Sequence, residues 1–395
     1  MATTTLVKKK RKTIAYLDTI IFIGITGLFF GYIGSKMGVS KMFETIMQTA
    51  YSLLIDTVFY IMAIAVLAGA FGKLATEFGL VKLLNKIFSP LMRPLFNMPG
   101  VAFLGIITTY LSDNPAIISL AKDEGYLNYF EENEVPCLCN LGTAFGMGLI
   151  VTTFMISQGY LREALVGNLG AIVGALVSVR LMAKKTKKHL ESKKGKIKNK
   201  YEYKREDLAI TSDIELEENE ESNFFERFLT AFLDGGKLGV DIGLNIIPGV
   251  IVICTIVMLL TFGPNDPSVG YQGKAYEGVA LLPQIGQYLS PILKPLFGFK
   301  SPEAIAFPIT ALGAVGAALS LIPKFIQSNI IGGNEIAVFT AMGMCWSGFL
   351  STHVAMLEEL GNRKLISKAI TSHLVGGLVA GIFAHYFLMI VNIII

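Results

Sequence analysis

Two stretches of this chain, SPLMRPLF at residues 89–96 and SPILKPLF at residues 290–297, spell nearly the same phrase. Each copy has two prolines four residues apart, a basic residue before the second proline and a closing Leu-Phe pair. The first copy closes an amphipathic stretch, residues 73–96, which we expect to be an interfacial helix ended by its prolines. A phrase that recurs this way indicates an internal repeat, and it allows the two halves of the chain to be aligned.

The composition indicates a polytopic membrane protein. The chain has 395 residues, of which 52% are hydrophobic and 16% charged, and its mean hydropathy is +0.57. A soluble domain has about a quarter charged residues. We predict membrane spans near 13–34, 50–72, 134–157, 162–183, 237–262, 334–357 and 366–394, because a span needs about 20 mainly apolar residues.

The charge pattern predicts the orientation and the domain organisation. Basic clusters at 8–12 and 184–205 should both be cytoplasmic, because Lys and Arg near span ends collect on that side. The second cluster runs into the acidic stretch ELEENEES at 215–222, which is typical of a solvated linker. We expect four parts: N-terminal transmembrane helices at 1–72, a first repeat at 73–183, a charged cytoplasmic linker at 184–223 and a second half at 224–395.

The repeat extends well beyond the opening phrase. TAFGMG at 143–148 matches TAMGMC at 340–345, and TTF at 152–154 matches STH at 351–353. A glycine-rich span closes each half. The same order at similar spacing favours two structural repeats.

An even number of crossings must separate two cytoplasmic segments, yet the first half offers five apolar stretches. The stretch 99–121 is interrupted by Ser112-Asp113-Asn114-Pro115, which disfavours helix. We therefore expect a re-entrant hairpin there and an equivalent one at 302–326. The second half would then have the opposite orientation, giving an all-α polytopic protein of two inverted repeats with broken helical hairpins, a recurrent plan of secondary transporters.

The sequence resembles the nucleoside-recognition, or Gate, domain family of membrane proteins, and it is distantly similar to concentrative nucleoside transporters. The resemblance is carried by YLSDNPAIISLA at 110–121, KSPEAIAFPITALGAVGAAL at 300–319 and CWSGFLST at 345–352. It implies a transporter fold with a nucleoside-like solute bound at the hairpins. The complete Gln-Thr-Glu motif of those transporters is absent, so the solute stays open.

Polar residues within apolar segments are functional candidates, because they are costly in a membrane. Asp113 is the strongest, since a carboxylate beside unwound backbone can contact a cation or a polar solute. The alternative is a carboxylate that only caps the broken helix. For His353, the alternative to solute or proton binding is a packed histidine bonded to a backbone carbonyl. The predicted solute- or ion-binding residues are Ser112, Asp113, Asn114, Thr152, Thr153, Glu303, Ser351, Thr352 and His353. Asp56, Asp241 and Asn245 are weaker candidates.

We interpret the chain as a secondary-active transporter of a small polar solute in the plasma membrane. The sequence contains no metalloprotease, nucleophile-elbow or phosphate-loop motif, which argues against an enzyme. We expect no cofactor or resident metal beyond a coupling Na⁺ or H⁺. The expected partners are the lipid bilayer and the solute, not nucleic acid, and a homo-oligomer stays open. The alternative function is a non-transporting membrane module, or a channel subunit, that acts with a partner protein.

Overall fold

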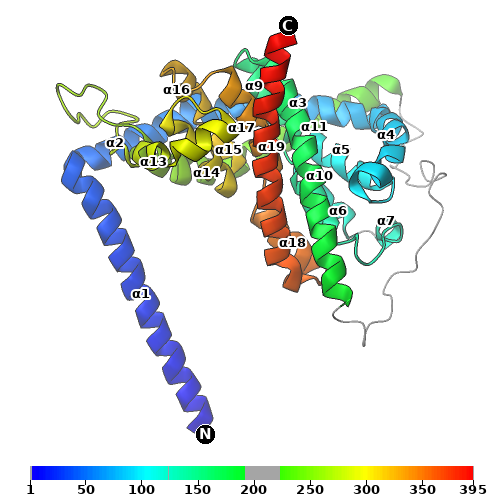
Figure 1. Ribbon diagram of the computed structural model, residues 1–395, viewed down its shortest axis with the longest axis horizontal. Helices are drawn as coiled ribbons and strands as arrows, with labels where there is room; N and C mark the ends of the chain where they lie inside the picture. The colour runs from blue at the N-terminus through cyan, green and yellow to red at the C-terminus, as the bar shows by residue number, and fades with distance from the viewer. Residues whose placement is uncertain (1, 123, 192–222, 395) are drawn as a thin grey trace. The chain divides into compact units, whose positions relative to one another are not determined.

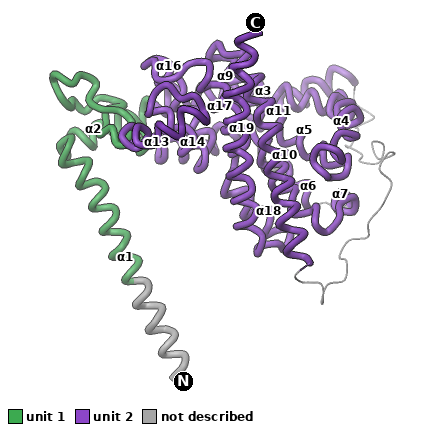
Figure 2. The backbone as a smooth tube through the Cα atoms, in the orientation of Figure 1, with its two compact units in different colours: residues 1–52, 255–281 green, residues 53–254, 282–395 purple. Residues whose placement is uncertain are grey.

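A computed structural model describes residues 2–122, 124–191 and 223–394, and all regular elements in these ranges are helices. The chain divides into two compact units, one of residues 1–52 and 255–281 and the other of residues 53–254 and 282–395 (Figure 2). Most of the predicted linker, residues 192–222, lies outside the described residues. Residues 184–191 continue a long helix.

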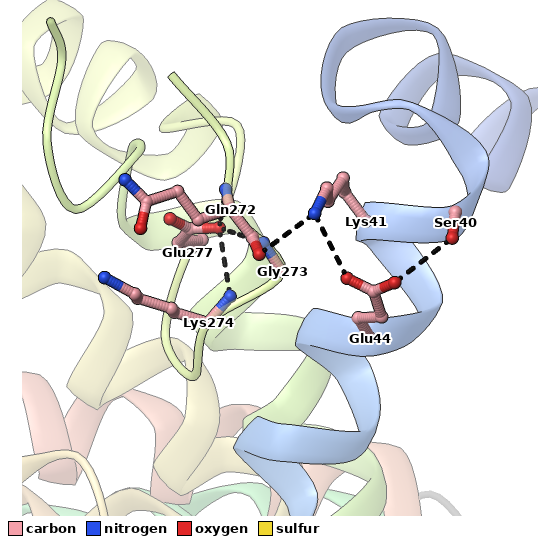
Figure 3. A network of polar contacts seen from close by, with 7 residues as sticks. All are labelled: Ser40, Lys41, Glu44, Gln272, Gly273, Lys274 and Glu277. Carbon is pink, nitrogen blue, oxygen red and sulfur yellow. Dashed lines mark hydrogen bonds and ion pairs between the residues drawn. The ribbon is translucent and has the colours of Figure 1, made fainter. Parts of the chain in front are cut away.

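The smaller unit contains α1 (Ala2–Met37), α2 (Val39–Ser52) and α12 (Thr255–Thr261). Its buried apolar core consists of Ile33, Met37, Met42, Leu259 and Val279. The loop after α12 is fixed by one buried carboxylate, Glu277, whose Oε2 accepts the N–H groups of Gln272 and Gly273 at 2.9 Å (Figure 3). Lys41 of α2 donates to the carbonyl of Gln272 at 3.3 Å, so this loop is held against α2.

Six helices in the described residues are long and apolar enough to cross a membrane. They are Tyr16–Met37, Val39–Glu77, Cys137–Ser157, Leu161–Glu191, Phe224–Thr261 and Arg363–Ile394. Four of them precede residue 192. The four cysteines are free and buried, as is typical of cysteines that pack as small apolar side chains.

The larger unit is built around two helix pairs. One pairs α3 (Phe59–Glu77) with α11 (Phe224–Pro248), and the other pairs α10 (Leu161–Glu191) with α19 (Ile366–Ile394), which run side by side in Figure 1. In both helix pairs, glycine residues let the two backbones approach each other closely. A Cβ at Gly69 would lie 2.4 Å from the carbonyl oxygen of Gly235, and one at Gly174 would lie 2.6 Å from that of Gly376. Small residues of this kind are typical of helix contacts in membranes.

The repeated phrase lies in two amphipathic helices, α4 (Leu80–Phe96) and α13 (Leu281–Phe297). The prediction that its prolines end these helices was wrong, because all four prolines lie inside them. The helices end instead at residues with left-handed backbone, Asn97 at φ 56° and Gly298 at φ 69°. Asn97 N–H bonds the carbonyl of Arg93 at 3.0 Å, and Gly298 N–H bonds that of Lys294 at 2.8 Å, so both ends close in the same way.

The last turns of α4 and α13 also receive equivalent side-chain donors. Arg180 of α10 donates to the carbonyls of Pro94 and Leu95 at 2.9 and 2.8 Å. Tyr386 of α19 donates its hydroxyl to the carbonyl of Pro295 at 2.7 Å. The last helix of each half therefore binds the amphipathic helix of the same half.

The two predicted hairpins are present as pairs of short helices. The first is α5 (Ala102–Leu111) and α6 (Pro115–Leu120), and the second is α14 (Ala306–Gly313) and α15 (Val315–Leu319). A ten-residue helix is about 15 Å long, half the thickness of a bilayer core. Neither arm can therefore span a membrane alone, and the predicted break at 112–114 is confirmed. Short segments precede and follow the hairpins: α7 (Glu124–Leu127), η3 (Pro302–Ile305) and α16 (Ile322–Gln327).

A broken helix follows each hairpin. In the first half α8 (Cys137–Thr143) and α9 (Gly148–Ser157) are separated by residues 144–147, and in the second half α17 (Gly333–Cys345) and α18 (Ser351–Glu359) are separated by residues 346–350. The predicted span 334–357 is therefore not one continuous helix, because the chain leaves the helix around Gly348 at φ 63°.

Two other helices each contain a six-residue π-helical segment. In the first half it is η1 (Leu53–Val58), and in the second half it is η2 (Gly249–Cys254). The short turn η4 (Arg363–Leu365) precedes α19.

Candidate functional site

The two hairpin breaks and the two broken helices meet around one cavity of about 380 Å³. All of its lining residues belong to the larger unit. They are Asp113, Asn114, Ile118, Met147, Ile242, Asn245, Ile246, Gly249, Gly313, Ala314, Val315, Gly316, Ser347, Gly348, Ser351, Thr352 and Ala355. Four separate interruptions of helix therefore expose backbone and side chains to the same space. Irregular backbone of this kind is tolerated in a membrane where it lines a cavity.

The first hairpin contributes the acidic wall of the cavity. The helix ends at Ser112, whose hydroxyl donates to the carbonyl of Thr108 at 2.6 Å, and it restarts after Asn114. The Nδ2 group of Asn114 donates to Asp113 Oδ1 at 3.0 Å and to Ser347 Oγ at 3.2 Å. Asn114 is buried while Asp113 is half-buried, so the amide orients the carboxylate and links the first hairpin to the α17–α18 break.

The α17–α18 break contributes hydroxyl groups. Ser347, Ser351 and Thr352 all line the cavity, and the N–H of Thr352 bonds the carbonyl of Gly348 at 2.9 Å. A Cβ at Gly348 would lie 2.4 Å from Thr352 Oγ1 and 2.6 Å from Asn114 Nδ2. Glycine is therefore required here both by its positive φ and by the close approach of the first hairpin.

The second hairpin contributes small apolar groups. Its break is the single residue Ala314, with extended backbone at φ −161° and ψ 116°, flanked by Gly313 and Val315. The amide of Asn245, on α11, adds a further polar group to the lining. Asp113 is the one ionisable side chain among the described lining residues. The cavity therefore has hydrogen-bonding groups and one acidic group but no basic residue, an arrangement that favours a neutral polar or cationic ligand over an anion.

The structure brings four of the nine predicted site residues into this cavity, namely Asp113, Asn114, Ser351 and Thr352. Ser112 lies at the break but turns its hydroxyl back to its own helix. Thr152 is buried on α9, where its hydroxyl donates to the Gly148 carbonyl and accepts from Asn168, and Thr153 lies beside it on the same helix. Glu303 lies in η3 before the second hairpin. His353 is buried next to the lining residue Thr352.

Two polar lining residues were not among the nine, and each had a signal in the sequence. Ser347 lies within the CWSGFLST stretch, one residue before the glycine that breaks the helix. Asn245 shares a helix face with Asp241, which is exposed and does not line the cavity. In the described residues, no group of three or more His, Cys, Asp or Glu side chains could hold a metal ion.

Comparison with solved structures finds the transporter CNTnw in several states. The structure of CNTnw in an inward-facing substrate-bound state aligns with a TM-score of 0.55 at 14% identity, covering 95% of this chain and 85% of that chain. Structures of a CNTnw variant in the intermediate 1 and intermediate 2 states align with TM-scores of 0.53 and 0.52. No family model and no curated protein matches this chain. The chain therefore has a fold like that of CNTnw, and its membership of the nucleoside-recognition family stays a prediction.

Proposed function

We propose that this protein is a secondary-active membrane transporter of a small, polar, nucleoside-like solute, and that the solute binds in the cavity between the two hairpin breaks. The observation that carries the proposal is the convergence of four helix breaks on one cavity that contains both hydroxyl and amide groups and one carboxylate. Helices broken near the middle of a membrane protein are the usual place for solute sites in secondary transporters. The likeness to CNTnw in a substrate-bound state supports a nucleoside-like solute.

The proposed roles follow from the geometry. Asp113, oriented by Asn114, accepts hydrogen bonds from the solute, and Ser347, Ser351 and Thr352 donate or accept on the opposite wall. The volume of about 380 Å³ lies at the lower end of the range of small-molecule sites, about 300–1,000 Å³. Because the sequence contains no phosphate-loop motif for ATP, active transport would use an ion gradient or a partner protein, and we propose an ion gradient. Movement of one repeat against the other would expose the cavity to each side in turn.

The test is uptake into proteoliposomes, with a panel of nucleosides, nucleobases and amino acids as solutes. We expect saturable uptake of one class, and Asp113→Asn should lower its rate at low solute concentration by about 10- to 100-fold, because a charge-assisted hydrogen bond contributes about 1.5–3 kcal/mol. Glu303→Gln is the matched control, since Glu303 does not line the cavity, and it should transport normally.

Two results would count against this function. If Asp113→Asn and Glu303→Gln lost uptake equally, the result would contradict the proposal that the solute binds in this cavity. If the purified protein moves none of the solutes and is not stabilised by any of them in a thermal-unfolding screen, yet co-purifies with another membrane protein, a non-transporting module is the better interpretation.

A further inference from the structure

Two fully buried histidines lie in contact behind the α17–α18 break. The rings of His353, on α18, and His373, on α19, have centroids 4.8 Å apart, and both side chains are 0% exposed. His353 directly follows the lining residues Ser351 and Thr352. The imidazole of His353 is therefore attached to the segment that carries the hydroxyl wall of the cavity.

The hydrogen bonds of His373 account for both of its ring nitrogens. Its Nε2 contacts the carbonyl oxygen of Cys345, which can only accept, so Nε2 carries the proton. Its Nδ1 lies 2.7 Å from the hydroxyl of Ser178 and accepts from it. Asn140 completes the chain, because its Nδ2 donates to Ser178 Oγ at 2.9 Å and to the carbonyl of Ala369 at 3.0 Å.

Protonation of His373 would break this chain. Its Nδ1 would become a donor toward Ser178, and the hydroxyl proton of Ser178 would lose its acceptor. The hydrogen bonds around His373 therefore favour its neutral form.

His353 differs from His373 in one respect. Its Nδ1 lies 2.6 Å from the carbonyl oxygen of Phe349, so Nδ1 carries the proton and Nε2 presents a lone pair. That Nε2 is buried and has no hydrogen-bond partner among the described residues. It is a basic nitrogen that can take a proton without breaking an existing hydrogen bond.

The groups around His353 supply no permanent countercharge. No described hydrogen bond or ion pair joins either ring to a carboxylate. The helices α6, α8 and α19 and the turn η4 pack against α18, and α6 has no ionisable residue. On α18 itself Glu358 and Glu359 are exposed and pair with Arg363 and Lys122. The remaining ionisable groups on these elements are Cys137, Cys139, Lys364, Lys368, His373, His385 and Tyr386.

We propose that Nε2 of His353 is the binding site for the coupling proton of this transporter. The proposal rests on the proposed transport function and identifies its coupling ion. A hydronium ion gives one proton to the Nε2 lone pair: its O–H bond breaks as the Nε2–H bond forms, and the products are an imidazolium and water. On the other side of the membrane the Nε2–H bond breaks and the proton returns to a water molecule.

Protonation would be coupled to movement of the cavity wall. In the conformation described here, a new Nε2–H donor has no acceptor, and a buried charged donor without an acceptor is strongly disfavoured. The protonated protein must therefore favour an arrangement in which α18 shifts and Nε2–H reaches water or an acceptor. Because Ser351 and Thr352 lie on the same turn, this shift changes the solute site, which is the differential interaction that coupling requires.

The internal repeat supports a role specific to one half. Where the second half has STH at 351–353, the first half has TTF at 152–154, so Phe154 is the equivalent of His353. Phe154 is also fully buried. An apolar ring therefore fits the equivalent place, and packing alone does not require an imidazole.

The first experiment measures proton binding directly and does not depend on transport. Ring nitrogens of the histidine-labelled protein in lipid nanodiscs are followed by NMR from pH 8 down to the lowest pH at which the protein stays folded, with His353→Asn to assign the signal. Asn keeps a donor for the Phe349 carbonyl but has no basic nitrogen. We expect Nε2 of His353 to be unprotonated at pH 8 and protonated at lower pH, while His373 stays neutral. If His353→Asn fails to fold, His373→Asn and His385→Asn assign the wild-type spectrum by elimination.

The second experiment measures coupling by solute uptake into proteoliposomes under an imposed pH gradient. One proton per solute gives about tenfold accumulation for each pH unit. His353→Asn should lose this accumulation but keep exchange of labelled for unlabelled solute, and His385→Asn should behave as wild type.

The outcomes separate the two proposals. If His353 titrates but no solute is transported, the proton site stands and the proposed function fails. If solute is transported but His353 stays neutral throughout the folded pH range, or accumulation follows a Na⁺ gradient alone, the proton site is overturned and the proposed function stands.

Discussion

The two hairpins of the larger unit have the same backbone plan but different chemistry at their breaks. Each begins after an amphipathic helix that contains two prolines, and each reverses between two short helices. The first breaks at Ser112-Asp113-Asn114, whereas the second breaks at Ala314 between Gly313 and Val315. The backbone interruption is thus common to both halves, and the charge is confined to one.

The two hairpins therefore differ in how they accommodate the break in the helix. A break costs unsatisfied backbone groups wherever it occurs, and the polar side chains of the first hairpin satisfy part of that cost locally. The second hairpin instead uses small residues, which let it approach η2, where a Cβ at Gly249 would lie 3.3 Å from the Cβ of Ala314. The first hairpin therefore presents polar groups at its break, and the second hairpin packs closely against η2.

The largest effect on stability should come from the glycine that meets the first hairpin. Gly348→Ala places a Cβ 2.4 Å from Thr352 Oγ1 at a residue with φ 63°, and we expect a loss of about 2–3 kcal/mol from strain and overpacking. The matched control is Gly313→Ala at the second break, where the nearest atom, Ile253 Cδ1, is 3.5 Å from the new Cβ. Thermal unfolding in nanodiscs measures both variants, and equal losses would contradict the asymmetry.

A second comparison uses the basic residues of the repeated phrase. Arg93 pairs with the buried carboxylate of Glu134, whereas Lys294 is exposed and forms no described ion pair. Arg93→Ala leaves that carboxylate without its cation and should cost about 2 kcal/mol. Lys294→Ala should cost less than about 0.5 kcal/mol. Unfolding of the two variants, measured in parallel, would contradict the difference if both shifted equally.

The stability loss of Arg93→Ala should depend on pH, because this substitution leaves the buried carboxyl group of Glu134 without its ion-pair partner. Burial raises the pKa of Glu134, and the N–H of Glu131 and the guanidinium of Arg93 counteract this rise. Without Arg93 the folded-state pKa rises further above the unfolded value. A raised carboxyl pKa favours the folded state at low pH and loses that benefit as pH rises. The deficit of Arg93→Ala should therefore be larger at pH 8 than at pH 5.

Local chemistry in the sequence was enough to predict the first break and the repeat. Ser112, Asp113, Asn114 and Pro115 each disfavour helix for a reason that acts within a few residues. The prolines of α4 and α13 were misinterpreted because the donors to the carbonyl groups of the last turns come from distant parts of the chain. Arg180, which donates to the carbonyl of Pro94, is 86 residues away from it. The break at residues 346–350 was not predicted, because Ser347 and Gly348 are also compatible with a continuous membrane helix.

The candidate site could be predicted only in part, because a cavity is a property of distant segments. Asp113 and Asn114 were identifiable from the break itself, and Ser351 and Thr352 from their recurrence in both halves. Asn245 was only a weaker candidate and Ser347 was none, and both are identified as lining residues only when the α17–α18 break, α11 and the first hairpin are placed together. His353 was an open choice in the sequence, and its distinction from His373 depends on which carbonyl or hydroxyl each ring nitrogen faces.

Small effects are also predicted for the donors that close the amphipathic helices, where the two halves should be alike. Arg180→Ala should cost about 1 kcal/mol and Tyr386→Phe about 0.5–1 kcal/mol, because each removes exposed hydrogen bonds to the last turn. The two sites share no partner, so the double variant should lose the sum within about 0.5 kcal/mol. Unfolding of the three variants tests this additivity. A loss from Arg180→Ala alone would mean that the scaffold, as well as the chemistry at the breaks, differs between the halves.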